Sequence, residues 1–211
     1  MDRHALNYFK KRAKHFVEMA SGGDSRALQR FRQYYRDGAV TRMRAQHILA
    51  REAGFCSWKA FLEASDTEMQ LAAVMDCHPL LCDHGMGVFN HWTFPPDDRQ
   101  TRLVEERRIL RASVDAVQKT RRWLRANVVE IKTINPGADS YHLKHLAEKE
   151  IDHTVVNGSY ESNYISNGVL IAAALSEGYG HRDLVSEGSP NVEFAMSERS
   201  LKAIRKRQGR Y

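Results

Sequence analysis

Residues 77–97, CHPLLCDHGMGVFNHWTFPPD, interrupt a chain whose apolar residues otherwise recur at helical spacing. The segment holds Pro79, Pro95 and Pro96, and no stretch of it keeps the three- and four-residue spacing of a helix. The segment is therefore the natural boundary between two modules. A chain of 211 residues is long enough for two small modules. We predict a helical bundle module, a connecting loop rich in Cys, His and Pro, a linking helix and an α+β module, at residues 1–76, 77–97, 98–127 and 128–211.

Four helices are predicted in the first module. Apolar residues recur at helical spacing from about Arg3 to Ala20, and Ser21-Gly22-Gly23 ends this helix. Gly54 follows the third helix as a C-terminal stop. The fourth helix is expected to reach about Met75, with a kink or a break. The caps expected for the second, third and fourth helices are Asp24 or Ser25, Thr41 and Ser57.

The pattern after the boundary predicts a long polar helix and then a small α+β module. Apolar residues of the run Val169–Leu175 have no polar neighbour between them, so we expect this helix to be largely buried. The expected fold class is thus mainly α. A winged-helix-like nucleic-acid module and a small α+β interaction domain would both produce this order. The expected elements are a strand near 128–134, helices over 140–151 and 166–177, a strand near 192–196 and a last helix capped by Ser197.

Residues 45–64, AQHILAREAGFCSWKAFLEA, have the outline of a helix-turn-helix. Gln46, Ala50 and Gly54 are spaced by four, where that motif has its first-helix start, a small residue and a glycine at the turn. Trp58, on the second helix, is a poor reader of bases and a good core anchor. The segment is either a DNA-reading motif or a simple αα-hairpin.

The same stretch, with LNYFKKRAKHFVEMASGGDSRALQRFRQYY before it, resembles a short bacterial helical module whose recurring end is A-R-E-x-G-F-x-S-W. That module is similar to a segment found in front of ankyrin repeats and in some glyoxalase-superfamily proteins. The resemblance implies a helical accessory domain. It carries over no ligand or chemistry, because this sequence contains neither an ankyrin nor a glyoxalase part.

The C-terminal stretch resembles uncharacterised small proteins of proteobacterial plasmids and integrative elements. The resemblance is carried by SYHLKHLAEKE, YISNGVLIAAA and PNVEFAMS, which match the outlines S-Y-x-L-K-H-x-x-E, Y-I-S-N-G-x-x-I-A-A-A and P-N-x-x-F-x-x-S. It implies an accessory protein encoded by a mobile element, with no established activity.

Charge is segregated into blocks along the chain, although the formal net charge is only +6. Residues 1–66, 99–132 and 199–211 are rich in Lys and Arg, whereas residues 67–98 and 133–198 are acidic. Like-signed blocks that meet on one surface create a footprint for a polyanion such as DNA or RNA, and solvated helix faces give the same pattern. The bases expected to contact phosphates are Arg42, Arg44 and Lys59 of the helical hairpin and Arg199, Lys202, Arg205, Lys206 and Arg207 of the basic tail.

Two other functions fit the same sequence. The acidic residues 133–198 match a phosphate backbone in sign, which suits a factor that inhibits a host nucleic-acid-binding complex, for example a CRISPR-type defence complex. The connecting loop also supplies thiol and imidazole ligands for a zinc site, at spacing that is not standard. A metal-dependent enzyme would use these ligands, which are Cys77, His78, Cys82 and His84, with His91 nearby.

Several classes of protein are not indicated. The sequence has no phosphate-binding glycine loop, nucleophile elbow, HExxH motif or dinucleotide fingerprint, which lowers the expectation of an enzyme. No run approaches the roughly 18 apolar residues of a membrane span, and the first residues do not form a signal peptide. With only three cysteines, we expect a soluble protein of the reducing cytoplasm.

Overall fold

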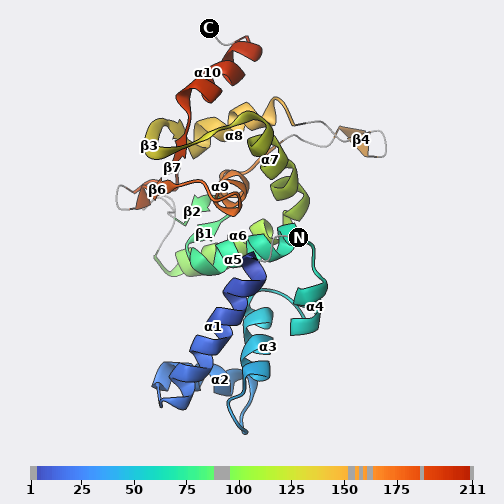
Figure 1. Ribbon diagram of the computed structural model, residues 1–211, viewed down its shortest axis with the longest axis vertical. Helices are drawn as coiled ribbons and strands as arrows, with labels where there is room; N and C mark the ends of the chain where they lie inside the picture. The colour runs from blue at the N-terminus through green and yellow to red at the C-terminus, as the bar shows by residue number, and fades with distance from the viewer. Residues whose placement is uncertain are drawn as a thin grey trace. The chain divides into compact units, whose positions relative to one another are not determined.

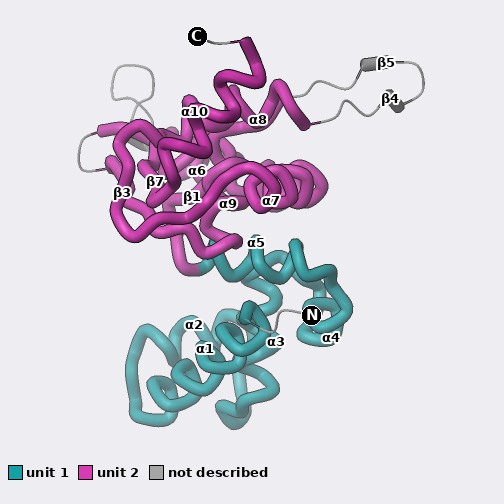
Figure 2. Tube along the Cα trace, turned by 45° about the horizontal axis from the view of Figure 1, so that its top comes forward, with its two compact units in different colours: residues 1–76 teal, residues 77–211 magenta. Residues whose placement is uncertain are grey.

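The computed structural model describes residues 4–87, 96–151, 155–156, 159–160, 164–185 and 188–209. The chain divides into two compact units, residues 1–76 and 77–211, which are coloured separately in Figure 2. The described chain is mainly helical, with a small antiparallel sheet in the second unit, which confirms the predicted fold class. Within these ranges, none of the helices combines the length and the apolar character that crossing a membrane requires.

Helices packed around an aromatic core make up the first unit (Figure 1). Phe9 and Phe61 are almost fully buried and meet edge to face with 4.9 Å between ring centroids. Asp24, Thr41 and Ser57 cap helices with their side chains, as predicted. The helices are α1 (His4–Ser21), α2 (Ser25–Tyr34), α3 (Arg42–Glu52), α4 (Trp58–Glu63) and α5 (Asp66–Cys77).

The fourth predicted helix is two helices, because Ser65 begins a new one. The backbone N–H of Ser65 donates to the Glu68 carboxylate at 2.8 Å, and the backbone N–H of Glu68 donates to the Ser65 hydroxyl at 3.3 Å. This reciprocal pair is a capping box. The chain therefore begins a new helix after Ser65, and α4 is only six residues long.

The motif A-R-E-x-G-F-x-S-W builds the corner between α3 and α4. Gly54 has φ of 93°, and Phe55 donates its N–H to the Ala50 carbonyl at 2.9 Å, as in a Schellman cap. Ser57 accepts the N–H of Ala60 at 3.0 Å and so caps α4. Trp58 stacks on Phe61 at 4.9 Å between centroids. Each of these residues has a local structural role, so the motif indicates a fold rather than a function.

The second unit contains the sheet and the remaining helices. The sheet has the order β3-β7-β6, with both pairs antiparallel. Two short hairpins, β1-β2 and β4-β5, lie outside it. The elements are β1 (Leu81–Cys82), β2 (Gly85–Met86), α6 (Pro96–Ala112), α7 (Val114–Asn127), β3 (Glu130–Asp139), α8 (Ser140–Glu148), β4 (Val155–Val156), β5 (Ser159–Tyr160), α9 (Asn167–Ser176), β6 (His181–Asp183), β7 (Val192–Met196) and α10 (Glu198–Arg207).

Residues 77–97 are not simply a connecting loop. Leu81 and Cys82 are fully buried in the β1-β2 hairpin, whose tight turn uses Gly85 at φ of 132°. Arg107 of α6 holds the entry to the hairpin, since its guanidinium donates to the carbonyl oxygens of His78, Pro79 and Leu81. Pro95 and His91 lie outside the described residues. The hairpin therefore belongs to the folded second unit.

The predicted linking helix over residues 98–127 is also different in the structure. It is two helices, α6 and α7, with Ser113 between them. Val117 and Leu124 are fully buried, and α7 packs against α9. The periodicity of the apolar residues correctly predicts helices here, but the burial of Val117 and Leu124 places α7 in the core of the second unit rather than in a free linker.

The tripeptide Asn135-Pro136-Gly137, whose composition is typical of a turn, lies inside the long edge strand β3. The register of β3 against β7 shifts on both sides of Asn135, so the extra residues are accommodated as bulges. The Asn135 side-chain oxygen accepts the N–H of Gly137 at 2.9 Å. Proline is tolerated here because β3 is at the edge of the sheet.

Candidate nucleic-acid interface

In the first unit, the segment with the helix-turn-helix outline packs as an αα-hairpin. The second helix, α4, is too short to span a groove, since six residues rise only about 9 Å. Trp58 points its ring onto Phe61 of the core rather than toward a ligand. The shortness of α4 and the packing of Trp58 on the core thus favour the αα-hairpin interpretation.

The three predicted phosphate contacts of this hairpin differ in their surroundings. Arg42 is exposed at the first position of α3. Arg44 donates to the Ala39 carbonyl at 3.1 Å and lies over the Tyr35 ring at 5.0 Å. Lys59 is exposed and pairs with Glu63 at 3.7 Å. Two of the three bases therefore already have partners within the unit.

The second unit has the element order of the winged-helix-like alternative. From α7 to β7 the chain runs helix, strand, helix, the short β4-β5 hairpin, helix and two antiparallel strands, and β3 pairs with the last of them. In a helix-turn-helix arrangement, α9 would be the helix presented to DNA. All residues of α9 from Asn167 to Ala174 are buried, which confirms the prediction of a largely buried helix for this part of it. The unit therefore has no exposed recognition helix at this place.

The β1-β2 hairpin covers the start of α9. Gly168 donates its N–H to the Asp83 carbonyl at 2.9 Å, and the Ser166 hydroxyl donates to the Asp83 carboxylate at 2.6 Å. Asn167 donates to the carbonyl oxygens of His84 and Pro190, both at 3.4 Å. The S-N-G motif therefore fixes the hairpin to the helix, which is a structural role.

The predicted zinc ligands lie in different settings. Cys77 is exposed at the last position of α5, whereas Cys82 is buried in the hairpin. Burial raises the pKa of the Cys82 thiol, which disfavours the thiolate that zinc binding needs. His84 is exposed at the turn, and His78 lies beside His181. In the part of the chain that the structure describes, no three or more His, Cys, Asp or Glu side chains are arranged to hold a metal ion.

His78 and His181 form a pair with 5.2 Å between ring centroids. Burial lowers the pKa of both imidazoles below 6.5; the charge of His181 further lowers the pKa of His78, and Asp183 opposes the shift in both. The folded protein therefore binds protons less readily at these positions than the unfolded chain does.

This pair predicts a pH dependence of stability. The free energy of unfolding is expected to fall as the pH drops below 6.5. The fall should end once the pH is below the lowered pKa values of the two imidazoles in the folded state. A His78→Gln/His181→Gln double variant should lose this part of the dependence. Urea unfolding at several pH values measures it, and an unchanged slope in the double variant would show that other groups cause it.

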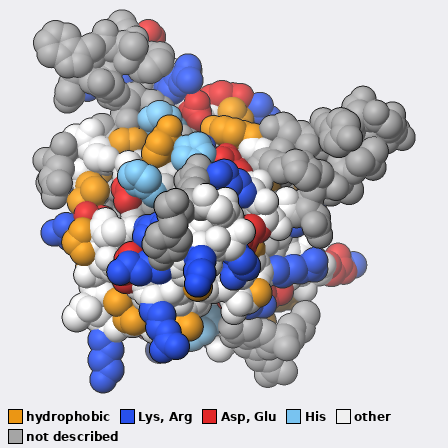
Figure 3. All heavy atoms as spheres, turned by 90° about the horizontal axis from the view of Figure 1, so that it is seen from above, with side chains coloured by type: hydrophobic (Ala, Val, Ile, Leu, Met, Phe, Trp, Pro, Cys, Tyr) orange, Lys and Arg blue, Asp and Glu red, His pale blue; other side chains and the backbone are white. Residues whose placement is uncertain are grey.

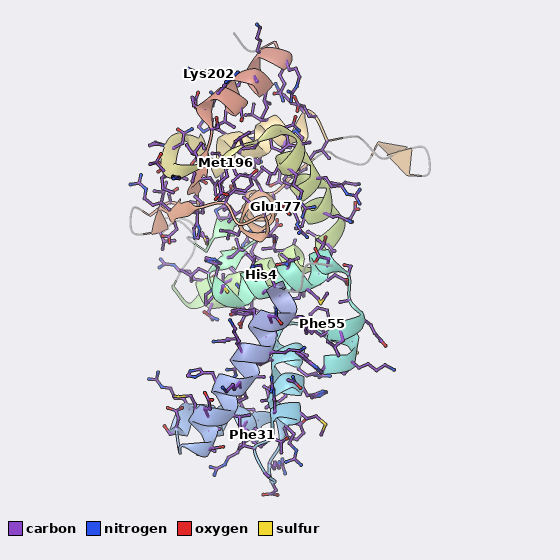
Figure 4. All side chains as sticks on the ribbon, viewed as in Figure 1. His4, Phe31, Phe55, Glu177, Met196 and Lys202 are labelled. Carbon is purple, nitrogen blue, oxygen red and sulfur yellow. The ribbon has the colours of Figure 1, made fainter. Side chains whose placement is uncertain are left out.

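Helix α10, predicted as a basic tail, is packed on the second unit. Leu201 and Ile204 are fully buried on one side of it. Arg199, Lys202 and Lys206 follow at spacings of three and four, which places them together on the opposite side. All three are exposed and have no hydrogen-bond or ion-pair partner among the described residues. Figure 4 labels Lys202 on this helix.

The two other predicted bases of α10 are neutralised. Arg205 pairs with Glu198 at 2.9 Å. Arg207 pairs with Glu150 at 2.7 Å and also donates to the Asn127 side chain at 2.9 Å. The helix thus has a narrow stripe of unpaired charge with a paired arginine on each flank. We call Arg199, Lys202 and Lys206 the α10 basic face.

The acidic residues of the second unit are largely paired within it. Every described glutamate between residues 133 and 198 takes part in an ion pair with Lys or Arg. The acidic and basic residues that are separated along the sequence therefore lie next to one another in the folded unit. The pairs are Glu148 with Lys144, Glu150 with Arg207, Glu177 with Arg121 and Arg125, Glu193 with Arg182 and Glu198 with Arg205.

Figure 3 shows the molecule from above, the side on which the C-terminus lies in Figure 1. Lys and Arg side chains lie across the middle of this face, with fewer Asp and Glu side chains between them.

Comparisons with known proteins do not add to these observations. No family model, no curated protein and no solved structure matches this chain.

The sequence presents the basic residues of the tail as one group, whereas the structure separates those with an ion-pair partner from those with none among the described residues. The signal was present in their spacing, because Arg199, Lys202 and Lys206 share a helix face that Arg205 and Arg207 do not. The partners of the paired arginines are distant in sequence and were not predictable from it.

Proposed function

We propose that the chain is a nucleic-acid-binding accessory protein and that the α10 basic face contacts the phosphate backbone of DNA or RNA. The observation that carries this proposal is the contrast within one helix. Arg199, Lys202 and Lys206 share one face and have no ion-pair partner in the part of the chain that the structure describes, while nearby carboxylates neutralise Arg205 and Arg207. Three cations in a row on a rigid helix match the repeated charges of a phosphate backbone.

The proposed binding does not depend on base sequence. Lys and Arg contacts to phosphates give affinity without base readout, and the apolar helix α9 is buried where a winged helix would read bases. An accessory or regulatory protein of a mobile element fits this mode, in line with the resemblance of the C-terminal stretch to plasmid and integrative-element proteins. The three free cysteines support a place in the reducing cytoplasm.

The alternative function, inhibition of a host complex by an acidic surface, has less support. Such a surface needs unpaired carboxylates, and the described glutamates of residues 133–198 are in ion pairs. We therefore prefer nucleic acid as the partner.

Fluorescence anisotropy with a short labelled duplex and a labelled single strand tests the proposal. The wild-type chain is expected to bind at low salt, and an Arg199→Ala/Lys202→Ala/Lys206→Ala variant should bind at least about tenfold more weakly. The matched control removes three exposed bases of the first unit in a Lys10→Ala/Lys11→Ala/Arg32→Ala variant, which should bind like the wild type. If neither nucleic acid binds at low salt, the proposal is wrong.

A further inference from the structure

A pocket of about 250 Å³ opens in the first unit, and α1, α2 and α3 each contribute to its lining. Its apolar part is formed by Phe16 and Met19 of α1, Ala27 of α2 and Leu49 of α3. Phe16 and Leu49 are buried core residues, so this wall is a fixed part of the fold. Ligand pockets in proteins combine such an apolar wall with a few placed polar groups.

The polar groups of the pocket are mainly cationic. Arg12, Arg26 and Arg30 line it, against one carboxylate, that of Asp24. The Asp24 side chain is already engaged, since it accepts the N–H of Ala27 at 2.7 Å as the cap of α2. The lining itself therefore holds more guanidinium groups than carboxylates.

Two of the three arginines are held in position by acids outside the lining. Arg30 binds Glu52 through two nitrogens of its guanidinium, and the guanidinium carbon lies 4.8 Å from the centre of the Phe16 ring. Arg12 pairs with Asp76 at 3.1 Å. These ion pairs fix the two side chains, so a ligand would meet them with little loss of side-chain entropy.

Arg26 brings the unpaired charge. It is exposed on α2, and the described residues give it no hydrogen-bond or ion-pair partner. Guanidinium groups bind carboxylates and phosphates through two parallel hydrogen bonds. An anion in the pocket would thus pair with the Arg26 guanidinium, which has no such partner among the described residues.

We propose that this pocket binds a small organic anion, in which an apolar group lies against Phe16, Met19 and Leu49 and a phosphate or carboxylate faces Arg26. The volume of about 250 Å³ is slightly below that of pockets for drug-sized molecules, so the ligand is small. This site is distinct from the α10 basic face, because its lining comes only from the first unit.

Isothermal titration of the full chain with phenyl phosphate, benzoate, inorganic phosphate and benzyl alcohol tests the proposal. Phenyl phosphate or benzoate is expected to bind at least about tenfold more tightly than both inorganic phosphate and benzyl alcohol, because only these two probes combine the apolar group with the charge. The probe that binds more tightly identifies the anion as phosphate or carboxylate. Equal binding of inorganic phosphate and phenyl phosphate, with no binding of benzoate, would overturn the proposal.

Two pairs of variants locate the binding. Arg26→Ala should weaken it about tenfold, whereas Arg32→Ala, an exposed base of the same helix outside the lining, should not change it. Met19→Ser should weaken it, and Met43→Ser, at a more exposed methionine of the same unit, should not. All four positions are on the surface or partly exposed, so the variants are expected to fold. If Arg26→Ala and Met19→Ser both bind like the wild type, the anion does not bind in this pocket.

Discussion

Replacing Gly168 with alanine is expected to lower the free energy of unfolding by about 3 kcal/mol or more, although alanine is the better helix former. A Cβ at this position would lie 1.9 Å from the Cys82 carbonyl oxygen and 2.8 Å from the Cα of Asp83. Both are backbone atoms of the β1-β2 hairpin, which cannot move aside as a flexible side chain can. The hairpin would have to leave α9, and the hydrogen bond from the Gly168 N–H to Asp83 would be lost.

Urea unfolding of the Gly168→Ala variant measures this loss. Gly178→Ala is the control, because Gly178 has φ of 85° but no atom within 4 Å of the added Cβ. Its cost comes from the left-handed backbone alone and should be about 1–2 kcal/mol. A smaller loss for Gly168→Ala than for Gly178→Ala would contradict the close packing of hairpin and helix.

Glu177→Gln is the second change with a large expected effect, a loss of about 3 kcal/mol in the free energy of unfolding. The Glu177 side chain is 9% exposed and accepts from Arg121, whose own side chain is 5% exposed, at 2.6 Å. Arg125 donates to the same carboxylate at 2.8 Å. Glutamine keeps the size of the side chain but removes its charge, so the ion pairs of Glu177 with the buried Arg121 guanidinium and with Arg125 are lost.

Thermal or urea unfolding of Glu177→Gln should be compared with Glu63→Gln. Glu63 also pairs with a base, Lys59, but both side chains are mostly exposed. That control is expected to lose less than about 1 kcal/mol, because exposed pairs are screened by solvent. Similar losses in the two variants would contradict the prediction that burial makes the Glu177 ion pairs contribute more to stability than an exposed pair does.

Local signals in the sequence predicted the local structure well. The caps Thr41 and Ser57 and the stop at Gly54 have the roles expected of them, because each acts through hydrogen bonds to residues at most a few positions away. The division of the chain into two units at residue 76 lies at the start of the proline-containing segment. The apolar run of α9 is buried as its composition required.

Long-range packing could not be predicted in the same way. The burial of the β1-β2 hairpin depends on Asp83 meeting Ser166 across 83 positions of sequence. The pairing of Arg207 with Glu150 spans 57 positions, so the sequence does not show that the acidic and basic blocks neutralise each other. For this reason the structure differs most from the sequence prediction at the candidate site. Arg205 and Arg207 are in ion pairs, so only Arg199, Lys202 and Lys206 of the tail remain as candidate phosphate contacts.

The salt dependence of nucleic-acid binding tests the central claim, which is that the α10 basic face contacts phosphates. Affinity for a labelled duplex is measured by anisotropy between about 50 and about 200 mM salt, and the slope of log K against log salt is compared between variants. The Arg199→Ala/Lys202→Ala/Lys206→Ala variant is expected to have a slope shallower by about 2 to 3 than the wild type, since each phosphate contact contributes about 0.9. The first-unit variant Lys10→Ala/Lys11→Ala/Arg32→Ala should keep the wild-type slope. An unchanged slope in the α10 variant, or an equal change in both, would contradict the proposed interface.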